Sequence, residues 1–208
     1  MKEHPILFSG AMVRAILEGR KTQTRRATGL DMVNVSPDDW TITWQGLVSD
    51  GNIGAQFDRR RESEFLTCEY GGPGDRLWVK ETWATAAAWD KQKPSDLSKT
   101  TPIYYHADKS HGSLVRWYDE DEERGRLRPS IFMCRWISRI TMEITGVRVE
   151  RLNDISERDA IAEGVERDAI CGPCSWYQML WENINGKGSW VKNPWVWVVE
   201  FQRLNSKG

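Results

Sequence analysis

The sequence lacks the features of a membrane protein or of a disulfide-stabilised one. No hydrophobic run approaches the roughly 20 residues that a bilayer-spanning helix needs. The N-terminal segment 1–8 carries charges and Pro5 where a signal peptide would have an apolar core. Four cysteines at irregular spacing are too few for a disulfide framework in a chain of 208 residues. We therefore expect a cytoplasmic protein that folds without cross-links.

An excess of charge of either sign is also missing. The formal net charge is −1, which argues against attraction to nucleic acid by the protein as a whole, so any basic surface must be local. Arg20, Lys21, Arg25 and Arg26 supply such a local group of cations. Arginine pairs with phosphate and stacks on bases, so we expect these residues to bind ligand, although such a cluster is more often simply solvated.

Tryptophan is abundant, with 12 residues in the chain. Each indole buries a large apolar area and carries one N–H group that needs a partner. We expect most of these side chains in the core, and one or two of them to form a stacking surface for bases.

The pattern of apolar residues predicts an α+β protein with several strands and short helices. Ser9 is expected to cap a helix over 10–18, and Ser156 a second one. The alternation in 137–151 predicts a strand with a bulge at Gly146. Further elements are expected at 41–44 (strand), 77–79 (strand), 103–105 (strand), 176–181 (helix) and 195–201 (strand). This order favours a compact barrel with peripheral helices, and the acidic run 119–123 is expected in a solvated loop.

Four segments carry a resemblance to a known family. They are Ile16–Arg26 with the motif GRKTQT, Gly74–Trp83 with GDRLWV, Ile155–Gly164 (ISERDAIAEG) and Asn193–Val198 (NPWVWV). Together they resemble the ASCH family, in particular its phage and prophage branch. The resemblance implies a single domain over 1–208, a small PUA-like β-barrel with peripheral helices and two insertions at about 27–67 and 84–128. It also implies an RNA, DNA or modified-nucleoside ligand in a basic cleft, in a bacterial host.

One branch of the family is similar to amidohydrolases of N4-acetylcytidine, and others are described as ribonucleases or binding modules. The resemblance implies catalytic roles for Lys21, Thr24 and Glu163. Lys80 and Glu81 follow the LWV strand, where we expect them to line the cleft with the arginines. Neither a cofactor nor a metal is expected, and the role of the CxxC pair at 171–174 is left open.

Chemistry leaves the function open among several alternatives. Thr24 could attack an amide if Lys21, with a lowered pKa, or Glu163 accepted its proton. Lys21 and Thr24 lie three positions apart, so they share a face on a helical turn but not on a straight strand. The alternative is that Lys21 and Glu163 form a plain salt bridge. A binding module, a hydrolase and a phage accessory protein that binds a host protein through its insertions all remain possible.

Overall fold

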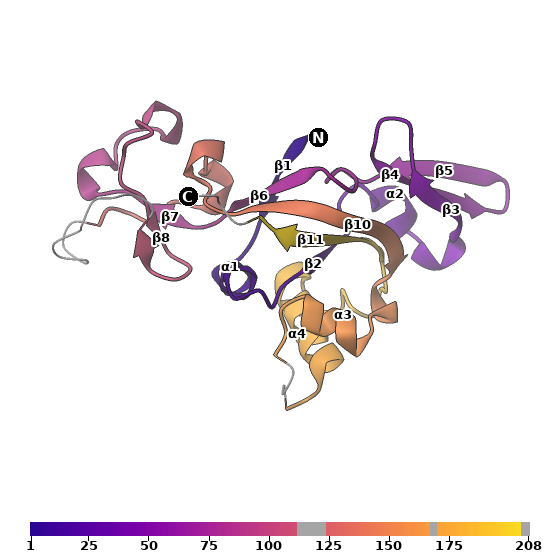
Figure 1. Cartoon of the computed structure of the whole chain (residues 1–208). Helices are drawn as coiled ribbons and strands as arrows, with labels where there is room; N and C mark the ends of the chain where they lie inside the picture. The colour runs from indigo at the N-terminus through magenta and orange to yellow at the C-terminus, as the bar shows by residue number, and fades with distance from the viewer. Residues whose placement is uncertain (112–123, 167–169, 205–208) are drawn as a thin grey trace.

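A computed structural model describes residues 1–111, 124–166 and 170–204 of the chain, and the acidic run 119–123 lies outside these ranges. The described residues form three β-sheets with short helices around them, so the predicted α+β class is confirmed (Figure 1).

The central sheet has five strands in the order β1-β6-β10-β11-β2. Its strands are β1 (Glu3–Leu7), β6 (Arg76–Lys80), β10 (Thr141–Arg151), β11 (Trp195–Arg203) and β2 (Gln23–Arg26). β1 runs parallel to β6, and the other pairs are antiparallel. The register shifts between Ile144 and Gly146, which confirms the predicted bulge.

The described strands do not close into a barrel, because the central sheet ends at β1 and β2, so the PUA-like barrel stays a prediction. The segment just before β2 meets the end of helix α3. Lys21 and Glu163 form an antiparallel bridge there, and the Thr22 amide donates to the Ala162 carbonyl at 2.8 Å. The helix end therefore lies beside the start of β2.

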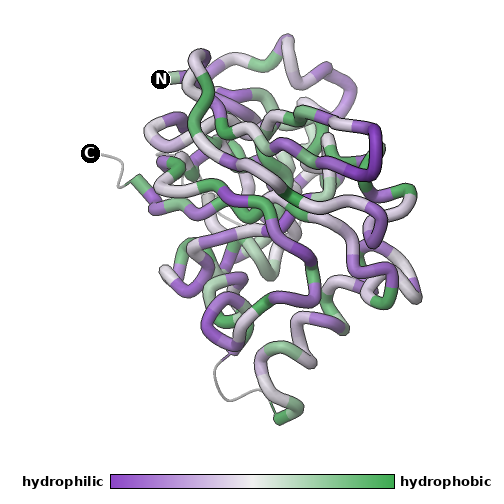
Figure 2. The backbone as a smooth tube through the Cα atoms, turned by 90° about the vertical axis from the view of Figure 1, so that its right-hand side faces the viewer, coloured by the Kyte–Doolittle hydropathy of each residue, from purple (hydrophilic) through white to green (hydrophobic). Residues whose placement is uncertain are grey.

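β11 lies between two apolar layers, which explains its nearly continuous hydrophobic sequence. Trp197 and Val199 face the large core shared with helix α1 (Gly10–Leu17), whereas Val196 and Val198 face α3 and α4. Figure 2 shows hydrophobic stretches running through the interior and many hydrophilic ones in the outer loops. Ser9 caps α1 as predicted, since its side chain accepts from the Met12 amide.

Two smaller sheets lie at opposite ends of the central one (Figure 1). The first, from the range 27–67, contains β3 (Thr41–Leu47), β4 (Ile53–Arg59) and β5 (Glu62–Thr67), preceded by α2 (Asp31–Asn34). The second, mainly from the range 84–128, contains β7 (Trp83–Ala84), β8 (Tyr104–Tyr105) and β9 (Ser110–His111). The short 3-10 helices are η1 (Pro37–Asp39), η2 (Ala87–Trp89), η3 (Pro94–Asp96), η4 (Ser130–Phe132), η5 (Arg135–Ile137) and η6 (Leu152–Asp154).

Helices α3 (Glu157–Ala162) and α4 (Pro173–Asn185) cover one face of the central sheet (Figure 1). Ser156 caps α3 as predicted, with its Oγ accepting from the Asp159 amide at 3.1 Å. α4 is longer than the predicted 176–181, because Pro173 suits its first turn and Gly186, at φ 94°, ends it.

We predict that Ser156→Ala lowers the free energy of unfolding by about 1 kcal/mol, because the first turn of α3 loses its capping acceptor. Urea denaturation followed by tryptophan fluorescence measures this loss. Ser156→Thr keeps a hydroxyl acceptor and should stay close to wild type. Equal midpoints for the Ala and Thr variants would contradict the prediction.

Candidate nucleoside pocket

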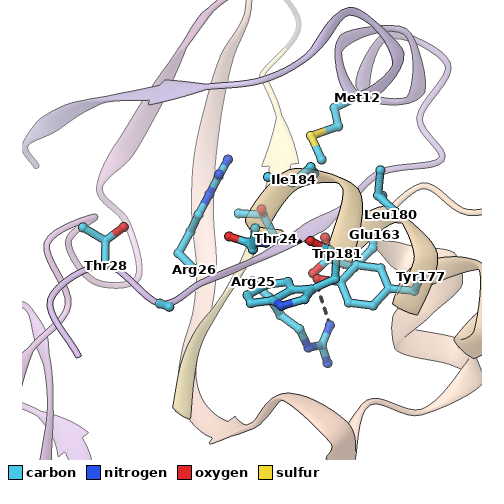
Figure 3. A pocket seen from close by; sticks show the side chains of 12 residues that line it. Met12, Thr24, Arg25, Arg26, Thr28, Glu163, Tyr177, Leu180, Trp181 and Ile184 are labelled. Atoms are coloured by element: carbon cyan, nitrogen blue, oxygen red, sulfur yellow. Dashed lines mark hydrogen bonds and ion pairs between the residues drawn. The ribbon is translucent and has the colours of Figure 1, made fainter. Parts of the chain in front are cut away.

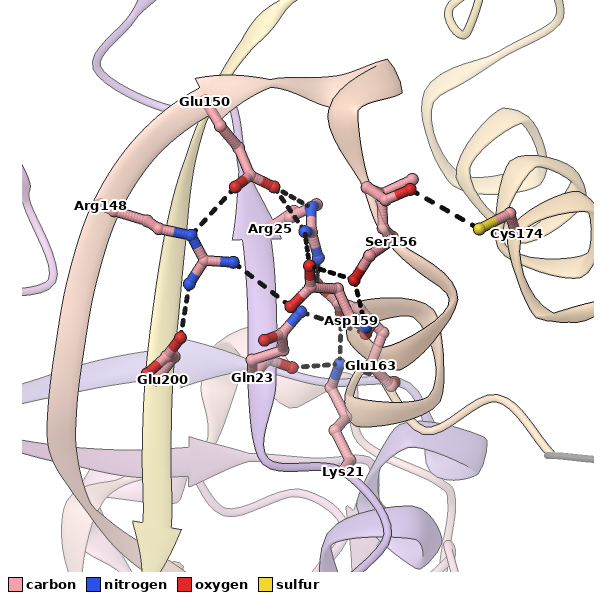
Figure 4. A network of polar contacts seen from close by, with 11 residues as sticks. Lys21, Gln23, Arg25, Arg148, Glu150, Ser156, Asp159, Glu163, Cys174 and Glu200 are labelled. Atoms are coloured by element: carbon pink, nitrogen blue, oxygen red, sulfur yellow. Dashed lines mark hydrogen bonds and ion pairs between the residues drawn. The ribbon is translucent and has the colours of Figure 1, made fainter.

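A buried ion cluster ties β2 to the C-terminal end of α3 (Figure 4). The Nζ of Lys21 donates to the Glu163 carboxylate at 2.8 Å, to the Glu163 carbonyl at 2.9 Å and to the Gln23 carbonyl at 2.9 Å. The side chains of Lys21 and Glu163 are 0% and 3% exposed. An ammonium group has three N–H donors, so all of those of Lys21 are in use.

Arg25 is the second buried cation of the cluster. It donates to the other oxygen of Glu163 at 3.2 Å and to Glu150 through its Nε at 3.1 Å, and it lies 3.7 Å from Asp159. Glu163 thus uses one carboxylate oxygen for each of two cations. Arg148 extends the network at its solvent side by joining Glu150 to Asp159.

Strand alternation places these side chains. Arg25 pairs with Val198 of β11 and shares its α3-facing side, whereas Thr24 pairs with Val199 and shares the opposite side. Burial lowers the pKa of Lys21 below its ordinary value, and the neighbouring Glu163 opposes this shift. Lys21 therefore combines a lowered pKa with a saturated set of hydrogen bonds.

A pocket of about 150 Å³ opens beside this cluster, between α1, β2 and α4 (Figure 3). Tyr177 and Trp181 supply an aromatic wall from α4, and Thr24, Arg26 and Glu163 supply polar groups. The remaining lining residues are Met12, Arg25, Ala27, Thr28, Leu180, Ile184 and Asn185. Burial raises the pKa of the Tyr177 hydroxyl well above its ordinary value, so this group is a neutral donor near neutral pH.

Two buried donors of the pocket residues lack an acceptor. Within residues 1–111, 124–166 and 170–204, neither the Nε of Arg26 nor the Nε1 of Trp181 has a hydrogen-bond partner. A buried N–H group without a partner costs free energy. Both atoms lie within the wall of the pocket, out of reach of a ligand, so the pocket offers the aromatic faces of Tyr177 and Trp181 and the polar side chains that line it.

The structure brings most of the predicted site residues together. The residues that line the pocket are Thr24, Arg25, Arg26 and Glu163. Lys21 does not line it but donates to the Glu163 carboxylate. The predicted basic patch is wrong, however, because Lys21 and Arg25 are buried and matched by carboxylates. Cations at β2 positions that face α3 are withdrawn from solvent when the helix packs on them.

The other predicted ligand residues lie elsewhere. Arg20 is half-exposed and pairs with Glu18. Lys80 donates to the Ile131 carbonyl at 2.6 Å, and Glu81 is buried against Arg139 at 2.9 Å. Neither lines the pocket, because β6 lies on the far side of β10 and β11 from β2.

Sequence reasoning missed several residues of the site. The carboxylates Glu150 and Asp159 balance Arg25, and Tyr177 and Trp181 form the aromatic wall. The polar positions Arg148 and Glu150, two apart in a strand that was otherwise predicted correctly, were a signal for a charged stripe on one face. The i, i+4 spacing of Tyr177 and Trp181 was a signal for a shared helix face.

Other classes of site are not evident in the described part of the chain. Within it, no three His, Cys, Asp or Glu side chains are grouped to hold a metal ion, and no helix is long and apolar enough to cross a membrane. The four cysteines are free thiols. No family model, no curated protein and no solved structure matches the sequence. The resemblance to the ASCH family therefore stays a prediction.

The ion cluster generates a prediction about stability. Glu163→Gln should lower the free energy of unfolding by about 3–5 kcal/mol, because it leaves Lys21 buried without a carboxylate. Lys21→Met should cost less, because Glu163 keeps its bond to Arg25. Urea denaturation measures both variants.

The exposed pair of Arg20 and Glu18 provides the control for this prediction. Arg20→Met removes a solvated ion pair and should cost no more than about 1 kcal/mol. A Glu163→Gln variant as stable as Arg20→Met would show that the buried cluster does not stabilise the fold.

Proposed function

We propose that the pocket between α1, β2 and α4 binds the base of a nucleoside, free or within RNA or DNA, in an ASCH-type protein of PUA-like fold. The observation that carries the proposal is the pairing of an aromatic wall with polar side chains in one small pocket. Tyr177 and Trp181 offer faces for stacking, and Thr24 and Glu163 offer polar groups for the edge of a base.

The size and charge of the pocket limit the classes of ligand that it can bind. Its volume of about 150 Å³ is below the roughly 300–1,000 Å³ of pockets that enclose drug-sized molecules, which suits a base with the sugar outside. The charges of Lys21 and Arg25 are balanced by Glu163, Glu150 and Asp159. Arg26 forms no ion pair among the described residues, but its guanidinium donates to the Leu7 carbonyl at 2.8 Å and lies over the Phe8 ring. A base is therefore favoured over a phosphate group at this point.

The four segments that resemble the phage and prophage branch of the ASCH family support the same proposal. They contribute Thr24, Arg25 and Arg26 from the first segment and Glu163 from the third, all of which line the pocket. A protein of this type would act in the cytoplasm of a bacterial host.

Binding of cytidine, N4-acetylcytidine, uridine and adenosine, measured by isothermal titration calorimetry, tests the proposal. Trp181→Leu removes the aromatic ring but keeps an apolar side chain, so it should weaken binding at least about fivefold. Trp176→Leu is the matched control, because Trp176 lies on the same helix outside the pocket. Absence of binding by every nucleoside, or equal effects of the two substitutions, would refute the proposal.

Hydrolysis of an N4-acylated cytidine is the second candidate function. The specific observation in its favour is that Thr24 and Glu163 line one pocket and that Lys21 contacts Glu163. Thr24 would attack the acyl carbon, and its proton would pass to Glu163 and then to the leaving amine. Water would then cleave the resulting ester, which releases the acid and restores the Thr24 hydroxyl. Lys21 would hold Glu163 in place, since its three donors are already used.

Incubation with N4-acetylcytidine, followed by chromatography for cytidine, tests the hydrolase. Thr24→Val removes the nucleophile at nearly constant volume and should abolish turnover, whereas Thr24→Ser should retain part of it. Release of cytidine by the Val variant would exclude this mechanism. No release by wild type would exclude the hydrolase, and the binding proposal would still be judged by calorimetry.

A further inference from the structure

The lobe built around β7, β8 and η4 contains a second groove, remote from the pocket in the sequence. Its volume is about 360 Å³. Its lining includes four cations and no carboxylate. The lining residues are Lys91, Gln92, Lys93, Pro94, Arg126, Leu127, Arg128, Pro129 and Phe132.

Arg128 is a buried cation of this groove, with the residue only 4% exposed. Its guanidinium donates to the carbonyls of Gln92 at 2.9 Å and Trp89 at 2.6 Å and lies over the Trp83 ring at 5.2 Å. Among the described residues, no carboxylate forms an ion pair with it and its Nε has no acceptor. Burial lowers the pKa of Arg128, and the Asp90 carboxylate opposes this shift without forming an ion pair with it. Asp90 instead accepts from the Arg126 amide at 3.0 Å, so the charge of Arg128 is compensated only in part and an anion in the groove is favoured.

The cations form two short rows on neighbouring segments. Lys91 and Lys93 lie two positions apart on one segment, and Arg126 and Arg128 lie two positions apart on the other. The bond from Arg128 to the Gln92 carbonyl ties the segments together. Lys91, Lys93 and Arg126 are exposed, and in the part of the chain that the structure describes none of them forms a salt bridge. Two pairs of cations suit a ligand with regularly repeated negative charges.

Apolar surfaces complete the groove. Pro94 and Pro129 line it, and Phe132 presents an aromatic ring with 58% of the residue exposed. An acidic peptide would satisfy the cations but would leave this ring without a partner. Bases that alternate with phosphates would satisfy both, because every base has a face that can stack.

We propose that this groove binds single-stranded nucleic acid, with its phosphates on Lys91, Lys93, Arg126 and Arg128 and a base on Phe132. The contacts need no base-specific donor, so binding is expected to depend little on sequence. This site does not rest on the function proposed for the nucleoside pocket.

Fluorescence anisotropy with a dye-labelled oligouridylate and a dye-labelled oligothymidylate tests the proposal over a series of salt concentrations. The triple variant Lys91→Ala, Lys93→Ala, Arg126→Ala should bind at least about tenfold more weakly. The slope of log K against log salt should fall in magnitude by about two, at roughly 0.7 for each of three lost phosphate contacts. Phe132→Ala should weaken binding about fivefold without changing this slope.

The matched control is the triple variant Lys99→Ala, Lys187→Ala, Lys192→Ala, which loses the same charge at exposed positions outside the groove. Its affinity should stay within about twofold of wild type. Equal weakening by both triple variants would overturn the proposal. Binding of dye-labelled polyglutamate but of neither oligonucleotide would overturn it in favour of an acidic protein partner.

Discussion

The sharing of one buried carboxylate by two buried cations is the interaction on which the rest of the structure depends. Glu163 stands at the end of α3 and receives Lys21 on one oxygen and Arg25 on the other. Each ion would be costly to bury alone, so β2 and α3 must meet in one register for all three charges to be compensated. That register also fixes α4, because α3 and α4 share an apolar cluster beneath the sheet.

The same interaction shapes what the pocket can recognise. With Lys21 and Arg25 compensated by carboxylates, the pocket offers stacking surfaces and polar side chains, and Arg26 is its one lining cation without an ion pair among the described residues. The groove beside β7 and β8 differs, since its four cations form no ion pair among the described residues and Asp90 compensates Arg128 only in part. On our proposals, a nearly neutral chain would contain one site suited to bases and one suited to phosphates, and its net charge reveals neither.

The sequence predicted the features that depend on a few neighbouring residues. The caps at Ser9 and Ser156 and the bulge near Gly146 are short-range effects, and each was located correctly. The burial of Arg25 could not be predicted in this way, because its partner Glu150 is 125 positions away. The contact between Lys21 and the end of α3 is equally distant in the sequence, so local patterns reveal neither this contact nor whether the strands close into a barrel.

The two ends of the central sheet have a consequence for how the protein behaves at high concentration. An exposed sheet edge is a template on which strands of other molecules can assemble, and natural proteins suppress it. Here the end of α3 bonds to Lys21 and Thr22 at the start of β2, and β1 contains Pro5, which lacks the amide donor that an incoming strand would need. The bonds that join α3 to the start of β2 thus also leave less of this edge open to a strand of another molecule.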